Sequence, residues 1–320
     1  MKRLALKKSH LISLLIFIVT YIWSKFIFDF YTAGDQIAYN WFFNESLNKN
    51  LAEVYAWQKY TLSASEPGFS MLIYLTNSFF SKSTLMSFSN ALLSVLFYQF
   101  IKDRKYAWLI LIFFLLNYYT SVIFFAAERL KFAVIALLII YKVKKLYWRE
   151  LALFIPSLFH FQYLLILPII YGRTYLLNPN FSRTTIRLPL LVIGIFAALF
   201  FLFLFGDVLL TKLQFYSGKA NFGSIAKSLI LGGILMTVSS QKRFDLFVAL
   251  YFCTLVLLLG GERVIFMEVI YILLIVKFKD IYRFSIFSIL SIYFALKTFD
   301  FYDLVFNCSQ GFLSLVDPCF

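Results

Sequence analysis

The segment Ala126-Ala127-Glu128-Arg129-Leu130-Lys131-Phe132-Ala133 places three charges inside an apolar run that extends from Tyr106 to Tyr141. A charged side chain at membrane depth is costly, so such residues usually face a protein-lined or water-filled cavity. On one continuous helix, a stripe of small side chains would share the face of the arginine: Ala126, Arg129, Ala133 and Ala136. We therefore expect Arg129 to point at a close-packed neighbour or a pocket. The alternative is that the three charges lie at the headgroups and only mark a helix end.

The composition identifies a membrane protein. Of the 320 residues, 62% are hydrophobic and only 14% are charged, and long apolar runs recur along the whole chain. The net charge of +14 comes from short basic clusters between apolar runs, among them Lys2-Arg3, Lys102 to Lys105, Lys142 to Lys145, Lys242-Arg243 and Lys277 to Arg283. This pattern is typical of positive-inside topology and not of nucleic-acid binding.

The apolar runs and basic clusters predict an all-α polytopic integral membrane protein, forming a single transmembrane domain over residues 1–320. We expect about eleven transmembrane helices, with the N-terminus inside and the C-terminus outside. The expected spans are 11–30, 84–101, two within 106–141 that turn near 117–125, two short or broken helices within 148–171, then 188–206, 225–239, 246–260, 264–278 and 284–299. The expected outer segments are the loops 31–66 and 207–224 and the tail 300–320. Cys308 and Cys319 are expected to pair if this tail faces an oxidising compartment.

Two short segments break this regular pattern. Pro67 follows Glu66, which predicts a helix start, but the apolar run that follows is short for a span. We interpret 67–81 as a re-entrant or interfacial helix. The chain passes from Glu66 outside to the basic cluster at Lys102 inside, which requires an odd number of crossings, and the span 84–101 already supplies one. In the run 148–171, two prolines bracket His160, and helix breaks at membrane depth are tolerated where protein or water covers them. His160 is therefore either a functional residue or a hydrogen-bonded core histidine.

The predicted topology gathers charged and aromatic residues at the outer side: Asp35, Tyr39, Glu66, Arg129, His160, Glu262 and Arg263. Two guanidinium groups at a membrane interface suit a diphosphate or other anionic headgroup, because arginine makes paired hydrogen bonds to phosphate oxygens. Asp35, Glu66 or His160 would be the catalytic base for a hydroxyl nucleophile. Tyr271 falls on the same helix face as Arg263 and extends its surface inward. No metal-ligand spacing and no nucleotide-binding motif is present in the sequence, so no cofactor is expected.

At these residues the chain resembles the EpsG family of bacterial exopolysaccharide polymerases, related in role to Wzy-type O-antigen polymerases. The resemblance lies in an ordered pattern: Gly34-Asp35 with Tyr39, Glu66-Pro67-Gly68-Phe69, Arg129 with Ala133, His160, and a late Arg263. It implies a glycosyltransferase that polymerises polyprenyl-diphosphate-linked oligosaccharide repeat units into capsule, O-antigen or exopolysaccharide at the outer face of the bacterial cytoplasmic membrane. Arg129 and Arg263 would then bind the donor diphosphate. A chain-length regulator and a flippase of the same pathway would be possible partners.

Two further interpretations stay open. Tyr39 and Trp41 either stack on sugar rings or anchor the chain in the membrane interface. Buried charges and broken helices are also expected of a transporter or flippase for a lipid-linked sugar or another anion. A noncatalytic scaffold would leave Arg129 and His160 unexplained.

Overall fold

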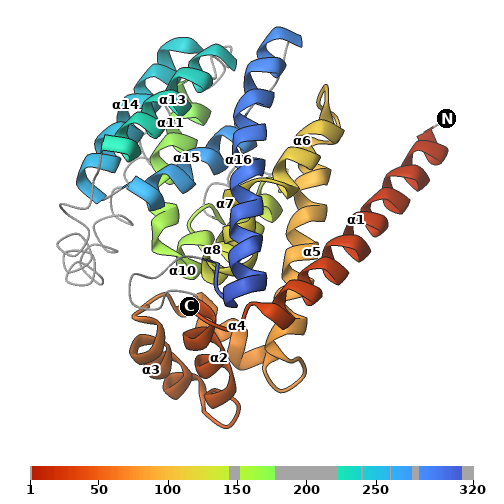
Figure 1. Ribbon diagram of the computed structural model, residues 1–320, viewed down its shortest axis with the longest axis vertical. Helices are drawn as coiled ribbons and strands as arrows, with labels where there is room; N and C mark the ends of the chain where they lie inside the picture. Colours follow the sequence, from red (N-terminus) through yellow and green to blue (C-terminus); the bar gives the residue numbers. More distant parts are fainter. Residues whose placement is uncertain are drawn as a thin grey trace, which may run out of the picture. The chain divides into compact units, whose positions relative to one another are not determined.

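The computed structural model describes residues 2–143, 152–176, 222–238, 241–259, 261–275 and 281–311. Every regular element within these ranges is a helix, which confirms the all-α prediction for the described part of the chain (Figure 1). The chain divides into two compact units, Met1–Tyr163 with Phe278–Phe320, and Leu164–Lys277. The predicted span 188–206 and most of the predicted loop 207–224 lie outside the described ranges.

The first unit contains the longest apolar helices. They are α1 (Lys2–Phe30), α5 (Lys82–Ile101) and α16 (Ile281–Cys308). Each of them includes a stretch that is long and apolar enough to cross a membrane: Ser9–Phe30, Lys82–Ile101 and Phe284–Cys308. α1 packs against α5. These helices support a membrane location, whereas a total of about eleven spans stays a prediction.

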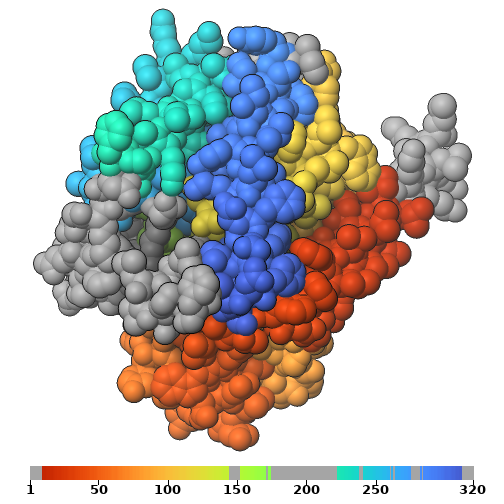
Figure 2. Space-filling view, in the orientation of Figure 1, coloured from red at the N-terminus to blue at the C-terminus, as the bar shows by residue number. Residues whose placement is uncertain are grey.

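The predicted outer loop 31–66 is itself mostly helical. α2 (Asp35–Glu45) and α3 (Leu51–Leu62) pack against each other as a hairpin, the orange region at the bottom of Figure 2. α3 begins at a capping box, in which Asn50 and Glu53 satisfy each other's backbone amides. α4 (Pro67–Thr76) follows and packs on α3. Pro67 lies in its first turn, which confirms the helix start predicted there. The short α4 has 10 residues.

The apolar run 106–141 differs from the predicted pair of spans. It forms α6 (Ala107–Leu115), α7 (Tyr118–Phe125) and α8 (Glu128–Ile140). α6 and α7 are bent by 58° and would make a fourth membrane crossing if the pair is one span. A second break at Ala126 and Ala127 separates α7 from α8. The predicted alanine stripe is therefore wrong at Ala126, because this residue is not on the helix that carries Arg129.

The predicted helix break at His160 is confirmed. α10 (Ile155–Phe159) ends at His160, whose backbone is extended, and a 3₁₀ helix (Phe161–Leu165) and α11 (Leu167–Leu176) follow. α10 packs on α8 and α4 within the first unit. His160 therefore lies where α10 ends and the 3₁₀ helix begins, and its imidazole is held at a junction of helices.

The second unit contains α11, α13 (Phe222–Val238), α14 (Lys242–Leu259) and α15 (Gly261–Ile275). α13, α14 and α15 pack against one another. At the other end of the chain, helix α16 of the first unit continues to Cys308, beyond the predicted start of the tail at 300. Its last turns stay helical because Phe301 and Val305 are buried. Cys308 takes part in a disulfide bond, and Cys319 lies outside the described ranges.

Candidate functional site

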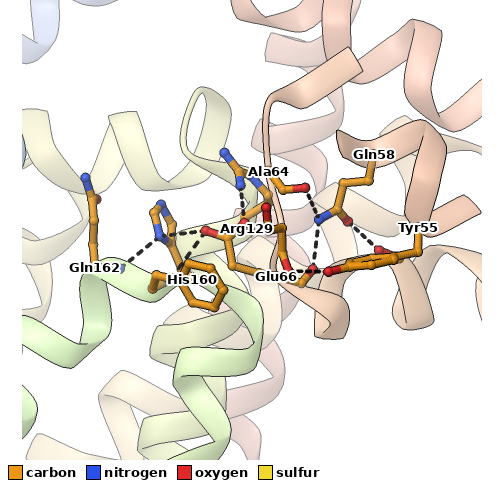
Figure 3. A network of polar contacts seen from close by, with 10 residues as sticks. Tyr55, Gln58, Ala64, Glu66, Arg129, His160 and Gln162 are labelled. Atoms are coloured by element: carbon orange, nitrogen blue, oxygen red, sulfur yellow. Dashed lines mark hydrogen bonds and ion pairs between the residues drawn. The ribbon is translucent and has the colours of Figure 1, made fainter. Parts of the chain in front are cut away.

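Glu66 is the centre of a polar cluster in the first unit. It precedes Pro67 at the start of α4, and its side chain does not cap that helix. The residue is fully buried, and its two carboxylate oxygens face different partners: Oε2 contacts Arg129, and Oε1 faces His160 and the backbone amide of Phe161 (Figure 3). A buried carboxylate is stable in such a place only when charged or hydrogen-bonding groups surround it.

Arg129 lies in the first turn of α8 and reaches across to α4. Its Nη1 is 2.6 Å from Glu66 Oε2, and the exposed fraction of its side chain is 15%. The guanidinium also lies close enough to the Tyr39 hydroxyl of α2 for its charge to act on that group. Burial raises the pKa of Tyr39 above its ordinary value of 10.0, and the nearby charge of Arg129 opposes that rise. Arg129 Nε is buried and has no hydrogen-bond partner. The guanidinium therefore retains a donor that the described side chains do not use.

His160 completes the cluster from the break after α10. Its Nδ1 lies 3.7 Å from Glu66 Oε1 and accepts a hydrogen bond from the backbone amide of Gln162 at 3.3 Å. The amide of Phe161 donates to Glu66 Oε1 at 3.4 Å. In this arrangement Nδ1 is the acceptor nitrogen of a neutral imidazole. If His160 gained a proton at Nδ1, it would form a second ion pair with Glu66.

Close packing brings the two sides of the cluster together. A Cβ atom at Gly68 of α4 would lie 2.9 Å from the backbone oxygen of Leu158 in α10, so only glycine permits this approach. On the other side, the fully buried Gln58 of α3 donates to the backbone oxygen of Glu66 at 2.8 Å and accepts from Ser70 at 2.7 Å. α3, α4 and α10 thus fix both Glu66 and His160.

A second buried polar network lies next to the first, and the sequence analysis did not identify it. Lys82 Nζ of α5 is 3.2 Å from Glu128 Oε1, and Gln36 of α2 donates to the same oxygen at 3.0 Å. Lys131 is fully buried and donates to Asn90 at 2.6 Å. Lys82 begins the apolar helix α5, and the repeated polar positions of this helix were the available signal.

Two other predicted site residues of the first unit, Asp35 and Trp41, lie at exposed positions of α2. Asp35 is exposed in the first turn of α2, after Gly34 with its φ of 62°. Trp41 is two residues from Tyr39 and points away from the core, with an exposed fraction of 47%. Its ring packs at 4.9 Å against that of Trp57. The structure therefore does not bring Trp41 to Arg129.

The second unit holds the remaining predicted residues. Tyr271 is buried in α15 and accepts a hydrogen bond from Arg173 of α11 at 3.2 Å. Arg173 also lies 3.3 Å from Asp245 of α14. Arg263 belongs to the first turn of α15, and its side chain lies outside what the structure describes. The predicted common surface of Arg263 and Tyr271 stays a prediction.

The cluster of Glu66, Arg129, His160 and Tyr39 combines a permanent cation, a carboxylate and an imidazole at one partly accessible place. Such a set can bind an anion and exchange a proton with a bound hydroxyl group. Among the described residues, no group of three or more histidine, cysteine or acidic side chains is placed to hold a metal ion.

Comparisons with known proteins give no further assignment of this chain. No protein-family model, no curated protein and no solved structure matches it.

Proposed function

We propose that this protein is a membrane-embedded glycosyltransferase that joins oligosaccharide repeat units carried on a polyprenyl diphosphate. The observation that carries the proposal is the contact of Arg129 with Glu66, with His160 on the other carboxylate oxygen. Chain breaks at Ala126-Ala127 and at His160 bring these residues together from separate helices. The resemblance to EpsG-type polymerases rests on the same residues.

The charge of the two adjacent networks supports an anionic ligand. Among the described residues that form them, the cationic side chains are Lys82, Arg129 and Lys131, and the carboxylates are Glu66 and Glu128. Arg129 is permanently charged and largely buried, and such a cation favours a negatively charged partner. A diphosphate headgroup carries such a charge and suits the forked donors of arginine.

The contacts suggest separate roles for the three central residues. Arg129 would bind the donor diphosphate, which is the leaving group of the transfer. His160 would take the proton of the acceptor hydroxyl at Nδ1, its acceptor nitrogen, and Glu66 Oε1 beside it would stabilise the imidazolium that forms. Glu66 would orient both side chains and balance their charge, because both its oxygens are engaged and it is buried.

The proposal includes the complete topology of about eleven spans, an N-terminus inside and a C-terminus outside. It also places the protein in a bacterial cytoplasmic membrane, with the cluster toward the outer side. Topology is tested by single cysteines at Asn48, in the turn between α2 and α3, and at Lys102, after α5. In a background with Cys253, Cys308 and Cys319 changed to serine, a membrane-impermeant maleimide should label position 48 in intact cells and position 102 only after permeabilisation. Equal labelling of both positions in intact cells would contradict the topology.

The activity is tested in a strain from which the gene is deleted, complemented with either the wild-type gene or the Arg129→Gln variant. A polymerase predicts that the deletion strain makes surface polysaccharide limited to single repeat units, and that Arg129→Gln fails to restore long chains. A transporter of the lipid-linked unit is the alternative, and the buried Lys82, Lys131 and Glu128 would suit it equally well. In that case the lipid-linked repeat units would accumulate at the inner face and none would reach the surface.

A further inference from the structure

The break between α7 and α8 interrupts the regular backbone hydrogen bonds of the chain at buried positions. The amides of Ala126 and Ala127 both donate to the backbone oxygen of Val122, at 2.9 and 2.7 Å, and α8 starts with the bond from Lys131 N to Ala127 O. Neither proline nor glycine occurs between Tyr118 and Ile140, so local sequence does not impose the break. In an apolar environment, backbone groups released by a break need other partners.

Side chains supply donors to the last carbonyl groups of α7. Lys131 Nζ donates to the backbone oxygen of Phe124 at 2.9 Å, which lies seven residues earlier. The Gln36 side-chain amide of α2 donates to the backbone oxygen of Phe125. Both donors are buried, with exposed fractions of 0% and 1%. The two carbonyl groups before the break are thus each bound by a side chain.

Each of these two donors is anchored in turn by other helices. Lys131 also donates to Asn90 of α5, whose side-chain amide donates to Ser24 of α1 at 3.1 Å. Gln36 accepts a hydrogen bond from Lys82 of α5 and donates to Glu128 of α8. The geometry at the break is therefore coupled to α1, α2 and α5.

The break decides the direction of Arg129. On an unbroken helix, Arg129 would point the same way as Phe125, four residues earlier. The Phe125 ring packs on Phe301 and Tyr302 of α16, at 6.5 and 6.2 Å between ring centroids. An arginine pointed in that direction would enter an aromatic core and would lose Glu66. Because α8 starts anew at Glu128, Arg129 faces α4 instead.

We infer that Lys131 and Gln36 are positioning residues, which hold the break between α7 and α8 through Phe124 O and Phe125 O and thereby direct Arg129 to Glu66. Neither side chain needs to touch a substrate. The inference rests on the proposed function only where it concerns catalysis, because the coupling of Lys131 to the Glu66–Arg129 pair exists in the protein without any ligand.

The test is a double-mutant cycle on the ion pair, repeated without the lysine donor. Thermal unfolding midpoints are measured for purified protein in one detergent, with Glu66→Gln, Arg129→Gln and both changes together. In the wild-type background, the double variant should shift the midpoint by clearly less than the sum of the single shifts. In a Lys131→Met background the shifts should become additive, because Arg129 no longer meets Glu66. Lys131→Arg, which keeps a donor, should retain the non-additive result.

A different outcome is expected if Lys131 only stabilises the fold and does not position Arg129. Lys131→Met would then lower every midpoint and leave the non-additivity unchanged, and that result would overturn the inference. If Lys131→Met does not yield folded protein, Gln36→Leu serves as the second background with the same expected loss of coupling, and retained coupling there would equally overturn it. Since no sugar transfer is measured, failure of the proposed function and failure of this inference give separate results.

Discussion

Arg129 Nη1 lies 2.6 Å from Glu66 Oε2, although 63 residues separate the two in the chain. The contact joins the first turn of α8 to the start of α4, and both helices begin at that point because the chain is interrupted just before them. Two interruptions of regular structure thus meet at one ion pair. A third interruption, at His160, faces the other oxygen of the same carboxylate.

Arg129→Lys distinguishes binding of an anion through two paired hydrogen bonds from attraction by charge alone. Lysine keeps the positive charge but not the two parallel donors, so we expect a loss of most polymerising activity with near-normal protein level. The readout is the chain length of the surface polysaccharide in cells that carry the variant. The matched control is Lys59→Arg on the exposed surface of α3, whereas Lys131 is unsuitable because it is fully buried. Wild-type chain lengths in Arg129→Lys would contradict the role in diphosphate binding.

Glu66→Gln should destabilise the fold. The change leaves the Arg129 charge largely buried without its partner, and removal of one member of such a pair costs roughly 3 kcal/mol. Thermal or denaturant unfolding of the purified protein measures the loss. Glu45→Gln, at an exposed position of α2, is the control and should change stability by less than about 0.5 kcal/mol. Equal stability of both variants would show that the ion pair contributes little.

Gly68→Ala tests the close approach of α4 and α10. The added methyl group meets the backbone oxygen of Leu158 at 2.9 Å, and backbone cannot yield as a side-chain end can. We expect a loss of stability of about 1–3 kcal/mol together with shortened polysaccharide, since His160 follows α10 directly. Gly233→Ala in α13 is the control, because nothing lies within 4 Å of its added carbon, and it should stabilise by up to about 1 kcal/mol.

The buried Tyr39 should contribute to the loss of stability at alkaline pH. Its pKa in the folded protein is raised above the ordinary 10.0 by burial, against the opposing effect of Arg129. The folded state therefore holds the phenolic proton more tightly than the unfolded state, so the contribution to stability is complete below pH 10 and decreases as the pH rises above it. Tyr39→Phe should make the free energy of unfolding fall less steeply above pH 10. Tyr60→Phe, at an exposed position of α3, should leave the slope unchanged.

The sequence by itself determined the features that depend on composition and local chain chemistry. Long apolar runs predict helices, and the described part of the chain is helical. Pro67 after Glu66 predicts the start of α4, and two prolines predict the break at His160. These predictions succeed because the deciding forces, proline geometry and the need to satisfy backbone groups in an apolar environment, act over a few residues.

Only the tertiary structure decided which of these elements meet. Ala126 and Ala127 are good helix formers, so their segment predicts one continuous helix and an alanine stripe that includes Ala126. The break occurs instead where donors from Lys131 and Gln36 take the place of backbone amides. In the sequence, Lys131 is one of three charges in an apolar run. In the structure it is a fully buried hydrogen-bond donor. Spacing along the chain indicates which side chains share one helix face, but a contact between Arg129 and Glu66 depends on how separate helices pack, and that is a property of the folded chain.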